Sequence, residues 1–140
     1  MSNLFSLEGK VVLITGASRG IGKAIATMLV AQGAKVAGTA TSESGAANIS
    51  DYLGDNGKGY ALNVTDPASI EATLAAIKAD LGDIDVLVNN AGITRDNLLM
   101  RMKEAEWDDI IDTNLSSIFR LSKAVLRPMM KKKNGRIINI

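Results

Sequence analysis

The sequence predicts an α/β fold in which helices cover both faces of a parallel sheet. Short apolar runs alternate with longer segments of helical period along the 140 residues. Runs such as VVLI at Val11–Ile14, VLV at Val86–Val88 and IINI at Ile137–Ile140 are apolar throughout rather than alternately polar. Such runs are typical of strands buried on both faces, and repeated strand–helix units with right-handed crossovers give a doubly wound sheet. No repeat, low-complexity tract or linker interrupts the pattern, so residues 1–140 are expected to form one Rossmann-type unit.

The elements follow from the apolar runs and from the residues that begin and end helices. Asp66 is a suitable cap and Pro67 a suitable first residue for a helix, and glycines at 33 and 82 end two helices. Strands are expected at Lys10–Thr15, Ala34–Thr39, Gly59–Val64, Asp85–Asn89 and Arg136–Ile140. Helices are expected at Gly20–Gln32, Ser44–Leu53 and Ala68–Leu81.

A long helix is expected from Lys103 to about Lys132. Pro128 should kink its last turn or end it, since proline cannot donate to the carbonyl of Ala124. The apolar residues recur every three to four positions, which predicts a helix face that packs on the sheet and, by its width, also offers a subunit contact. That face comprises Trp107, Ile110, Ile111, Ile118, Leu121, Val125 and Met129, widened by Leu115, Phe119, Ser122 and Leu126.

Composition excludes several classes of function. Apolar residues make up 46% and charged residues 22%, which is typical of a globular domain, and the net charge of +1 gives no global indication of nucleic acid or membrane binding. The absence of cysteine and histidine removes disulfides, thiol and imidazole chemistry and nearly all zinc sites, so no metal is expected. No apolar run has the length of a signal peptide or a transmembrane helix, and a cytoplasmic protein is expected.

A glycine-rich loop follows the first expected strand. Its three glycines suit a tight turn, a close approach of backbone to ligand, and a helix packed near the strand. The unpaired N–H groups of the following helix would bind a dinucleotide pyrophosphate, whereas a glycine-rich turn without ligand is the alternative. The candidate contacts are Gly16, Ser18, Arg19, Gly20, Ile21 and Gly22.

Several motifs resemble those of the short-chain dehydrogenase/reductase family. TGASRGIG at Thr15–Gly22 is similar to the family's first signature, NNAG at Asn89–Gly92 to its second, and TNLSS carries an asparagine, Asn114, at the active-site position. ITRDNLLMRM at Ile93–Met102, together with GTATSESG and RLSKAV, resembles a narrower group, the 3-oxoacyl-[acyl-carrier-protein] reductases of bacterial fatty-acid synthesis. The resemblance extends from about Leu7 to Ile140.

The nicotinamide cofactor is expected to be NADP(H). An NAD enzyme usually has an acidic residue at the end of the second strand, but the sequence there is VAGTATS and Glu43 comes later. Arg19 and Thr41 suit a 2′-phosphate, which a carboxylate would repel. The resemblance further implies that Asn63 and Val64 flank the adenine and that Asn90, Ala91 and Gly92 border the ribose. A plain strand-to-loop turn is the alternative for NNAG.

The resemblance implies reduction of a 3-oxoacyl thioester, for which the family uses Ser, Tyr, Lys four residues after the Tyr, and Asn. Asn114 matches the last, which holds a water in the proton relay; from the sequence alone it could equally bridge a distortion of the long helix. Tyr52 and Tyr60 are followed four residues later by Asn56 and Val64, not by lysine. We therefore expect this chain alone to be inactive. The alternatives are a non-catalytic dinucleotide-binding module and a short-chain reductase with another carbonyl substrate.

The end of the chain carries two expectations. Because the family's serine follows the fifth strand, the chain is interpreted as an N-terminal portion truncated after that strand, with an apolar edge at Ile137, Ile138 and Ile140. A basic cluster precedes this strand. It is either a solvated helix end or, as the resemblance implies, a docking surface for acyl carrier protein. The resemblance also implies a homotetramer. The cluster consists of Lys131, Lys132, Lys133 and Arg136.

Overall fold

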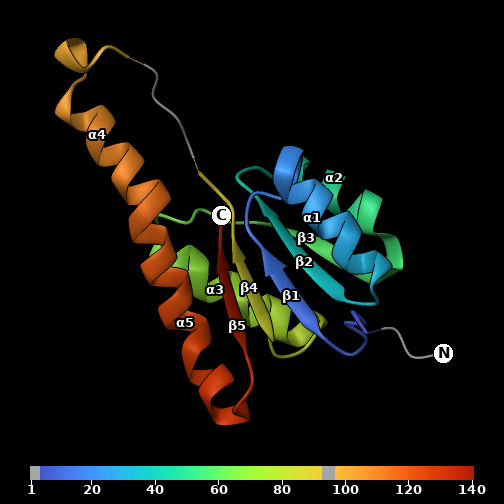
Figure 1. Cartoon of the computed structure of the whole chain (residues 1–140). Helices are drawn as coiled ribbons and strands as arrows, with labels where there is room; N and C mark the ends of the chain where they lie inside the picture. Colours follow the sequence, from blue (N-terminus) through green and yellow to red (C-terminus); the bar gives the residue numbers. More distant parts are fainter. Residues whose placement is uncertain (1–3, 93–96) are drawn as a thin grey trace.

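The structure, a computed structural model, describes residues 4–92 and 97–140. Within these residues one parallel sheet has the strand order β3-β2-β1-β4-β5 (Figure 1). The chain runs outward from β1 to β3, returns to the other side of β1 and continues to β5, which confirms the Rossmann-type doubly wound sheet. The strands are β1 (Val11–Ile14), β2 (Lys35–Ala40), β3 (Gly57–Ala61), β4 (Val86–Asn89) and β5 (Arg136–Asn139).

Strand β1 is buried on both faces, as its apolar sequence predicts. Val11 and Leu13 join the core on one face of the sheet, whereas Val12 and Ile14 join the core on the other. Successive side chains of a strand point to opposite faces, so a strand between two helical layers needs an apolar residue at every position.

Helices cover both faces of the sheet (Figure 1). α1 and α2 contribute Ala26, Ile49 and Leu53 to one core, and α3 and α5 contribute to the other. The cap predicted at Asp66 is confirmed, because its side chain accepts from the Ala68 N–H, and Ser42, which was not predicted as a cap, accepts from the Gly45 N–H at the start of α2. The helices are α1 (Gly20–Ala31), α2 (Glu43–Leu53), α3 (Pro67–Asp80), α4 (Glu104–Ile111) and α5 (Ser117–Lys132), with short 3₁₀ turns η1 (Gly54–Asn56) and η2 (Leu99–Arg101). Over the described ranges, none of them combines the length and apolar content needed to cross a membrane.

The third strand was predicted at Gly59–Val64, which is wrong by two or three residues at each end, because β3 is Gly57–Ala61. Its glycines indicate a turn in the sequence but here permit close packing. A Cβ atom at Gly57 would overlap the Val36 carbonyl of β2, and one at Gly59 would overlap the Ala46 carbonyl of α2. Glycine therefore lies inside this strand because neighbouring backbones approach it closely.

The expected single long helix is interrupted by a π-helical turn, η3 (Asp112–Ser116), between α4 and α5. The Ser117 N–H donates to the Asp112 carbonyl five residues earlier, which accommodates one extra residue in the turn. Asn114 lies in its middle, so the distortion anticipated at this residue is present. The expected end of the helix near Lys132 is confirmed, since α5 continues past Pro128 to Lys132, and of the two effects expected at Pro128 the structure excludes an end of the helix.

The apolar face of the long helix is only partly buried. Leu121, Val125 and Met129 pack in the core beneath α5 and are at most 5% exposed. Other apolar side chains of this region remain 46–65% exposed, so they do not pack on the sheet. These are Trp107, Leu115, Phe119 and Leu126. The predicted apolar edge is also present, since Ile137, Ile138 and Ile140 at β5 are 37–63% exposed.

Candidate functional site

A cleft of about 400 Å³ lies at the carboxyl edge of the sheet, where β1 and β4 lead into different loops. In open α/β sheets, ligands bind at this point of reversed strand order. Most of the predicted cofactor contacts line the cleft, namely Gly16, Ser18, Arg19, Gly20, Ile21, Thr41, Val64, Asn90, Ala91 and Gly92. Thr39, Ala40, Leu62 and Thr113 line it as well and were not predicted, whereas Gly22 and Asn63 do not line it.

The loop from β1 to α1 points the start of α1 into the cleft. Gly16 has a φ of +67°, a left-handed conformation that favours glycine, and the following Ala17 N–H donates to the Thr39 carbonyl at 2.8 Å. Arg19, the N-cap of α1, makes no side-chain cap hydrogen bond, in contrast to Ser42 and Asp66 at α2 and α3. The first N–H groups of α1 thus remain available to an anion.

Gly22 acts through packing rather than through contact with the cleft. A Cβ atom here would overlap the Gly16 carbonyl and lie 2.7 Å from Asn90 Nδ2. Only a residue without a side chain lets α1 pack this closely on the loop, as the sequence predicted for this position.

Asn90 and Thr15 hold the loop against the end of β4. Asn90 Nδ2 donates to the carbonyls of Thr15 and Gly16 at 3.2 and 3.1 Å. The Thr15 hydroxyl accepts from the N–H groups of Asn90 and Ala91 at 3.0 and 2.9 Å, and Thr15 is 1% exposed. The side chain of Asn90 therefore supports the loop. NNAG forms the strand-to-loop turn of the alternative interpretation, and Asn90, Ala91 and Gly92 also line the cleft. Thr15 was missed as a site residue, although its position directly before Gly16 was the available signal.

Two further supports could not be seen in the sequence. Thr39 Oγ1 accepts from the Gly16 N–H at 3.4 Å, and the Tyr52 hydroxyl donates to the Ala17 carbonyl at 2.6 Å. Burial raises the pKa of Tyr52, so this hydroxyl stays protonated as a donor. Both residues come from elements distant in sequence, and no local motif marks them.

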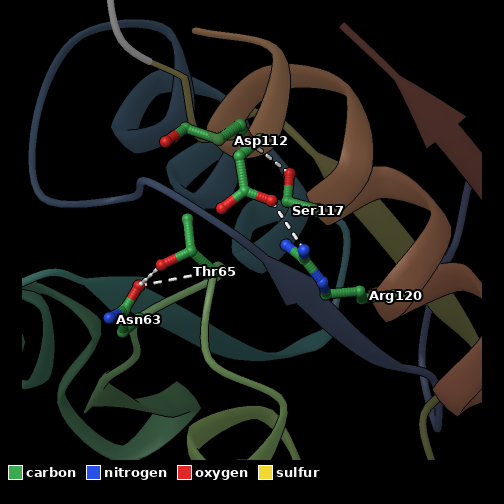
Figure 2. Close-up of polar contacts among 6 residues, drawn as sticks. Asn63, Thr65, Asp112, Ser117 and Arg120 are labelled. Atoms are coloured by element: carbon green, nitrogen blue, oxygen red, sulfur yellow. Dashed lines mark hydrogen bonds and ion pairs between the residues drawn. The ribbon is translucent and has the colours of Figure 1, made fainter. Parts of the chain in front are cut away.

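One end of the cleft combines a cation with hydroxyl groups. Arg19 and Thr41 both line the cleft and are exposed, and no Asp or Glu is among the described residues that line it. Glu43, the first residue of α2, also lies outside the lining. Asn63 was expected beside an adenine, but its Oδ1 accepts from the Thr65 N–H and hydroxyl at 3.0 and 2.6 Å (Figure 2). Its amide oxygen is therefore committed to a local turn.

The π turn forms another wall of the cleft. Thr113 lines it directly, and Asn114 lies beside Gly92, where a Cβ atom would be 3.1 Å from Asn114 Oδ1. The turn thus brings the predicted catalytic asparagine to the end of the NNAG motif. Of that neighbourhood, residues 93–96, which begin the predicted ITRDNLLMRM motif, lie outside the described residues.

Neither tyrosine lines the cleft. Tyr60 donates to Asp80 of α3 at 2.8 Å and packs in the core that α3 and α5 share with the sheet. Burial, this hydrogen bond and the charge of Asp80 all raise the pKa of Tyr60. Tyr52 is committed to Ala17. Neither is placed to act as a general acid for a ligand in the cleft, which agrees with the prediction from the sequence.

The basic cluster lies at the amino edge of the sheet, where α5 ends and β5 begins, opposite the cleft. Lys132 Nζ lies 2.5 Å from Asp85, which is 8% exposed and also accepts from the Val11 N–H at 2.9 Å. Burial alone would raise the pKa of Asp85, but the hydrogen bonds from Lys132 and Val11 and the nearby positive charges outweigh it and lower the pKa. Lys132 is thus part of a structural ion pair, and the other cations of the cluster, Lys131, Lys133 and Arg136, are exposed.

The sheet order and the cleft define the class: an α/β protein of Rossmann type with a ligand cleft at the reversal of strand order. The chain belongs to the short chain dehydrogenase family, whose model matches residues 10–140. This is a family of oxidoreductases that use a nicotinamide dinucleotide.

Curated relatives are very similar over nearly the whole chain. It is 75% identical to the 3-oxoacyl-[acyl-carrier-protein] reductase FabG of Salmonella typhimurium, 76% to that of Vibrio cholerae and 73% to that of Escherichia coli. Each match covers 96% of this chain and 55% of the relative. The chain therefore spans about half the length of these relatives and matches their N-terminal part.

Proposed function

We propose that this chain is the cofactor-binding part of an NADP(H)-dependent reductase that converts 3-oxoacyl-[acyl-carrier-protein] to the 3-hydroxyacyl product in fatty-acid synthesis. The observation that carries the proposal is the uncapped N-terminus of α1, which opens into the cleft beside Gly16 and Gly20. The helix dipole and free N–H groups favour a pyrophosphate there. A Cβ atom at Gly20 would meet no protein atom within 4 Å, which leaves room for a ligand.

The choice of NADP(H) rests on charge. A 2′-phosphate at the end of the cleft would pair with Arg19 and accept from the Thr41 hydroxyl. The described lining contains no carboxylate that would repel it or accept from a 2′-hydroxyl. When bound, the nicotinamide supplies a hydride to the ketone, and the resulting alkoxide needs a proton.

The chain contributes binding and one catalytic residue. Asn114 beside Gly92 is proposed to hold a water in the proton relay. The general acid is proposed to come from residues that this chain does not contain, since Tyr52 and Tyr60 are hydrogen-bonded elsewhere. The same observation favours a second candidate, a dinucleotide-binding module without catalysis of its own.

Titration with reduced dinucleotides tests the cofactor. NADPH should bind at least tenfold more tightly than NADH, because a charge-assisted hydrogen bond contributes roughly 1.5–3 kcal/mol. Arg19→Ala should remove most of this preference by weakening NADPH alone, whereas Arg127→Ala, an exposed arginine of α5, should change neither affinity. Equal or tighter binding of NADH to the unaltered chain contradicts the proposal.

Complementation separates the two candidates. The chain alone should not reduce a 3-oxoacyl thioester, but it should do so when co-expressed with the part of the Escherichia coli relative that lies beyond the matched residues. Asn114→Ala should abolish this restored activity and leave NADPH binding intact. A complex that forms, binds NADPH and remains inactive favours the module.

The partner is proposed to be acyl carrier protein, an acidic protein, docked at Lys131, Lys133 and Arg136. Charge reversal at Lys131 and Lys133 should weaken its binding in a salt-dependent manner and leave NADPH affinity unchanged, because the cluster lies at the edge opposite the cleft. Lys132→Glu is unsuitable, since it breaks the pair with Asp85. Equal carrier binding before and after charge reversal argues against docking here.

A cytoplasmic homo-oligomer, a tetramer by resemblance, is proposed as the assembled form. The exposed apolar side chains of α4 and α5 support it, since several large apolar side chains exposed on the same helical segment are typical of an interface. Substituting Phe119 and Leu126 by Asp should lower the oligomer's mass in light scattering; an unchanged mass contradicts this assignment of the face.

A further inference from the structure

An ion pair spans the π turn that carries Asn114. Asp112 is the first residue of the turn, and its carboxylate lies 2.6 Å from Arg120 Nη2 on α5 (Figure 2). The two side chains are 42% and 27% exposed, so the pair is partly shielded from water. The other terminal nitrogen, Arg120 Nη1, is buried and has no hydrogen-bond partner among the described residues. Arg120 is therefore held by Asp112 through one nitrogen.

The spacing of this pair depends on the π turn. In an uninterrupted α-helix, at about 100° per residue, positions eight apart lie roughly 80° apart around the axis. A π turn takes up one extra residue, so the same two positions are related as if they were seven apart, or roughly 20°. Asp112 and Arg120 thus face the same side of the helix only when the turn is present, and their attraction favours the π form over the straight helix.

Ser117 supports the same form from within the helix. It is 3% exposed, its hydroxyl donates to the Thr113 carbonyl and its N–H donates to the Asp112 carbonyl. These bonds occupy carbonyls of the turn that the altered pattern would otherwise leave unpaired. The Thr113 carbonyl directly precedes Asn114, the residue that lies beside Gly92.

We infer that Arg120 is a positioning residue: by pairing with Asp112 it holds the π turn that places Thr113 in the cleft wall and Asn114 beside Gly92. Without the pair, the turn opens more often and exchanges through this open state with a straight helix, in which the residues before the turn rotate by about 100° relative to α5. Arg120 acts on the turn and does not itself line the cleft. The consequence for dinucleotide affinity rests on the proposed function, whereas the consequence for the turn itself does not.

A double-mutant cycle followed by hydrogen exchange tests the inference on the whole chain. Arg120→Met and Asp112→Asn should each speed amide exchange at residues 113–118 about fivefold, which corresponds to a partly exposed ion pair. The double variant should exchange no faster than either single variant, because both changes remove the same contact. Arg127→Met, on the same helix, should leave these amides unchanged. Unchanged or additive effects overturn the inference.

NADPH affinity provides the second readout. Because only molecules in the π form bind well, each single variant should bind NADPH more weakly by at most about fivefold, again without a further loss in the double variant, and circular dichroism should show that all variants retain their helix content. A loss of affinity greater than about fivefold, or one that grows in the double variant, overturns the inference that Arg120 acts on the cleft only through the turn. If the unaltered chain binds no dinucleotide, the proposed function fails, and the exchange cycle still decides whether Arg120 holds the turn.

Discussion

Replacing Gly22 by alanine tests whether the close packing of α1 creates the dinucleotide site. The added Cβ atom overlaps the Gly16 carbonyl and comes at least 0.7 Å too close to Asn90 Nδ2, whose distance would be 2.7 Å against 3.4 Å for ordinary contact. A shift of α1 by this amount lengthens N–H···O bonds from about 2.9 Å to about 3.6 Å, beyond the hydrogen-bond range. Loss of one charge-assisted bond weakens binding roughly tenfold to hundredfold, measured by NADPH titration.

The free energy of unfolding of this variant should fall by a similar or smaller amount than the free energy of NADPH binding. Overpacking costs about 1–3 kcal/mol, but alanine in a helix interior regains about 1 kcal/mol relative to glycine, so a net loss of about 0–2 kcal/mol is expected in urea unfolding. Gly20 and Gly54 offer a matched pair of controls, since both have φ near +60° and a Cβ atom at either meets no protein atom within 4 Å. Gly20→Ala should weaken NADPH binding and Gly54→Ala should not. Wild-type affinity in Gly22→Ala would refute the reasoning.

Three further predictions concern buried polar groups. Thr15→Val keeps the shape but leaves two backbone N–H groups unpaired, and should lower the unfolding free energy by about 2–4 kcal/mol in urea; a loss below about 0.5 kcal/mol argues against its role. Asp85 has a lowered pKa in the folded state, so its contribution to the free energy of unfolding is full above the pKa of an unfolded aspartate, near pH 4. This contribution is lost as the pH falls through the folded-state pKa. Asp85→Asn should flatten this acid limb of the stability profile, and an unchanged limb contradicts the assignment. Tyr60 should ionise above the usual tyrosine range in an ultraviolet titration, and Asp80→Asn should lower its pKa; insensitivity to this change rules out the pairing.

The fold was predictable because its main signals are local. Strands such as β1 need apolar residues on both faces, and Ser42 and Asp66 satisfy the helix starts within two or three residues. The error at β3 has a non-local cause: Gly57 and Gly59 resemble turn residues until α2 and β2 are placed against them. Sequence periodicity detects which side of an element is buried, but not how closely another backbone approaches.

The candidate site was predictable to the extent that ligand contacts come from motifs. The glycine loop and NNAG both lead into the cleft, but the side chains that support them were missed. Thr39 and Tyr52 act on the loop from β2 and α2, and Thr113 reaches the cleft through a π turn that apolar spacing does not report. The contact expected between Asn63 and the adenine stays a prediction, since the amide oxygen of Asn63 accepts from Thr65 and the residue does not line the cleft.

The two edges of the sheet have different physical properties. At the carboxyl edge, glycines and an uncapped helix leave backbone N–H groups facing a cleft, and the polar side chains that hold them, Thr15 and Asn90, point at backbone rather than into the open space. At the amino edge, Asp85 and Lys132 join β1, β4 and α5 through a shielded ion pair. The hydrogen bonds around the loop hold the helix donors in place, and donors that are already in place before a ligand arrives bind it more strongly than donors that must first be ordered.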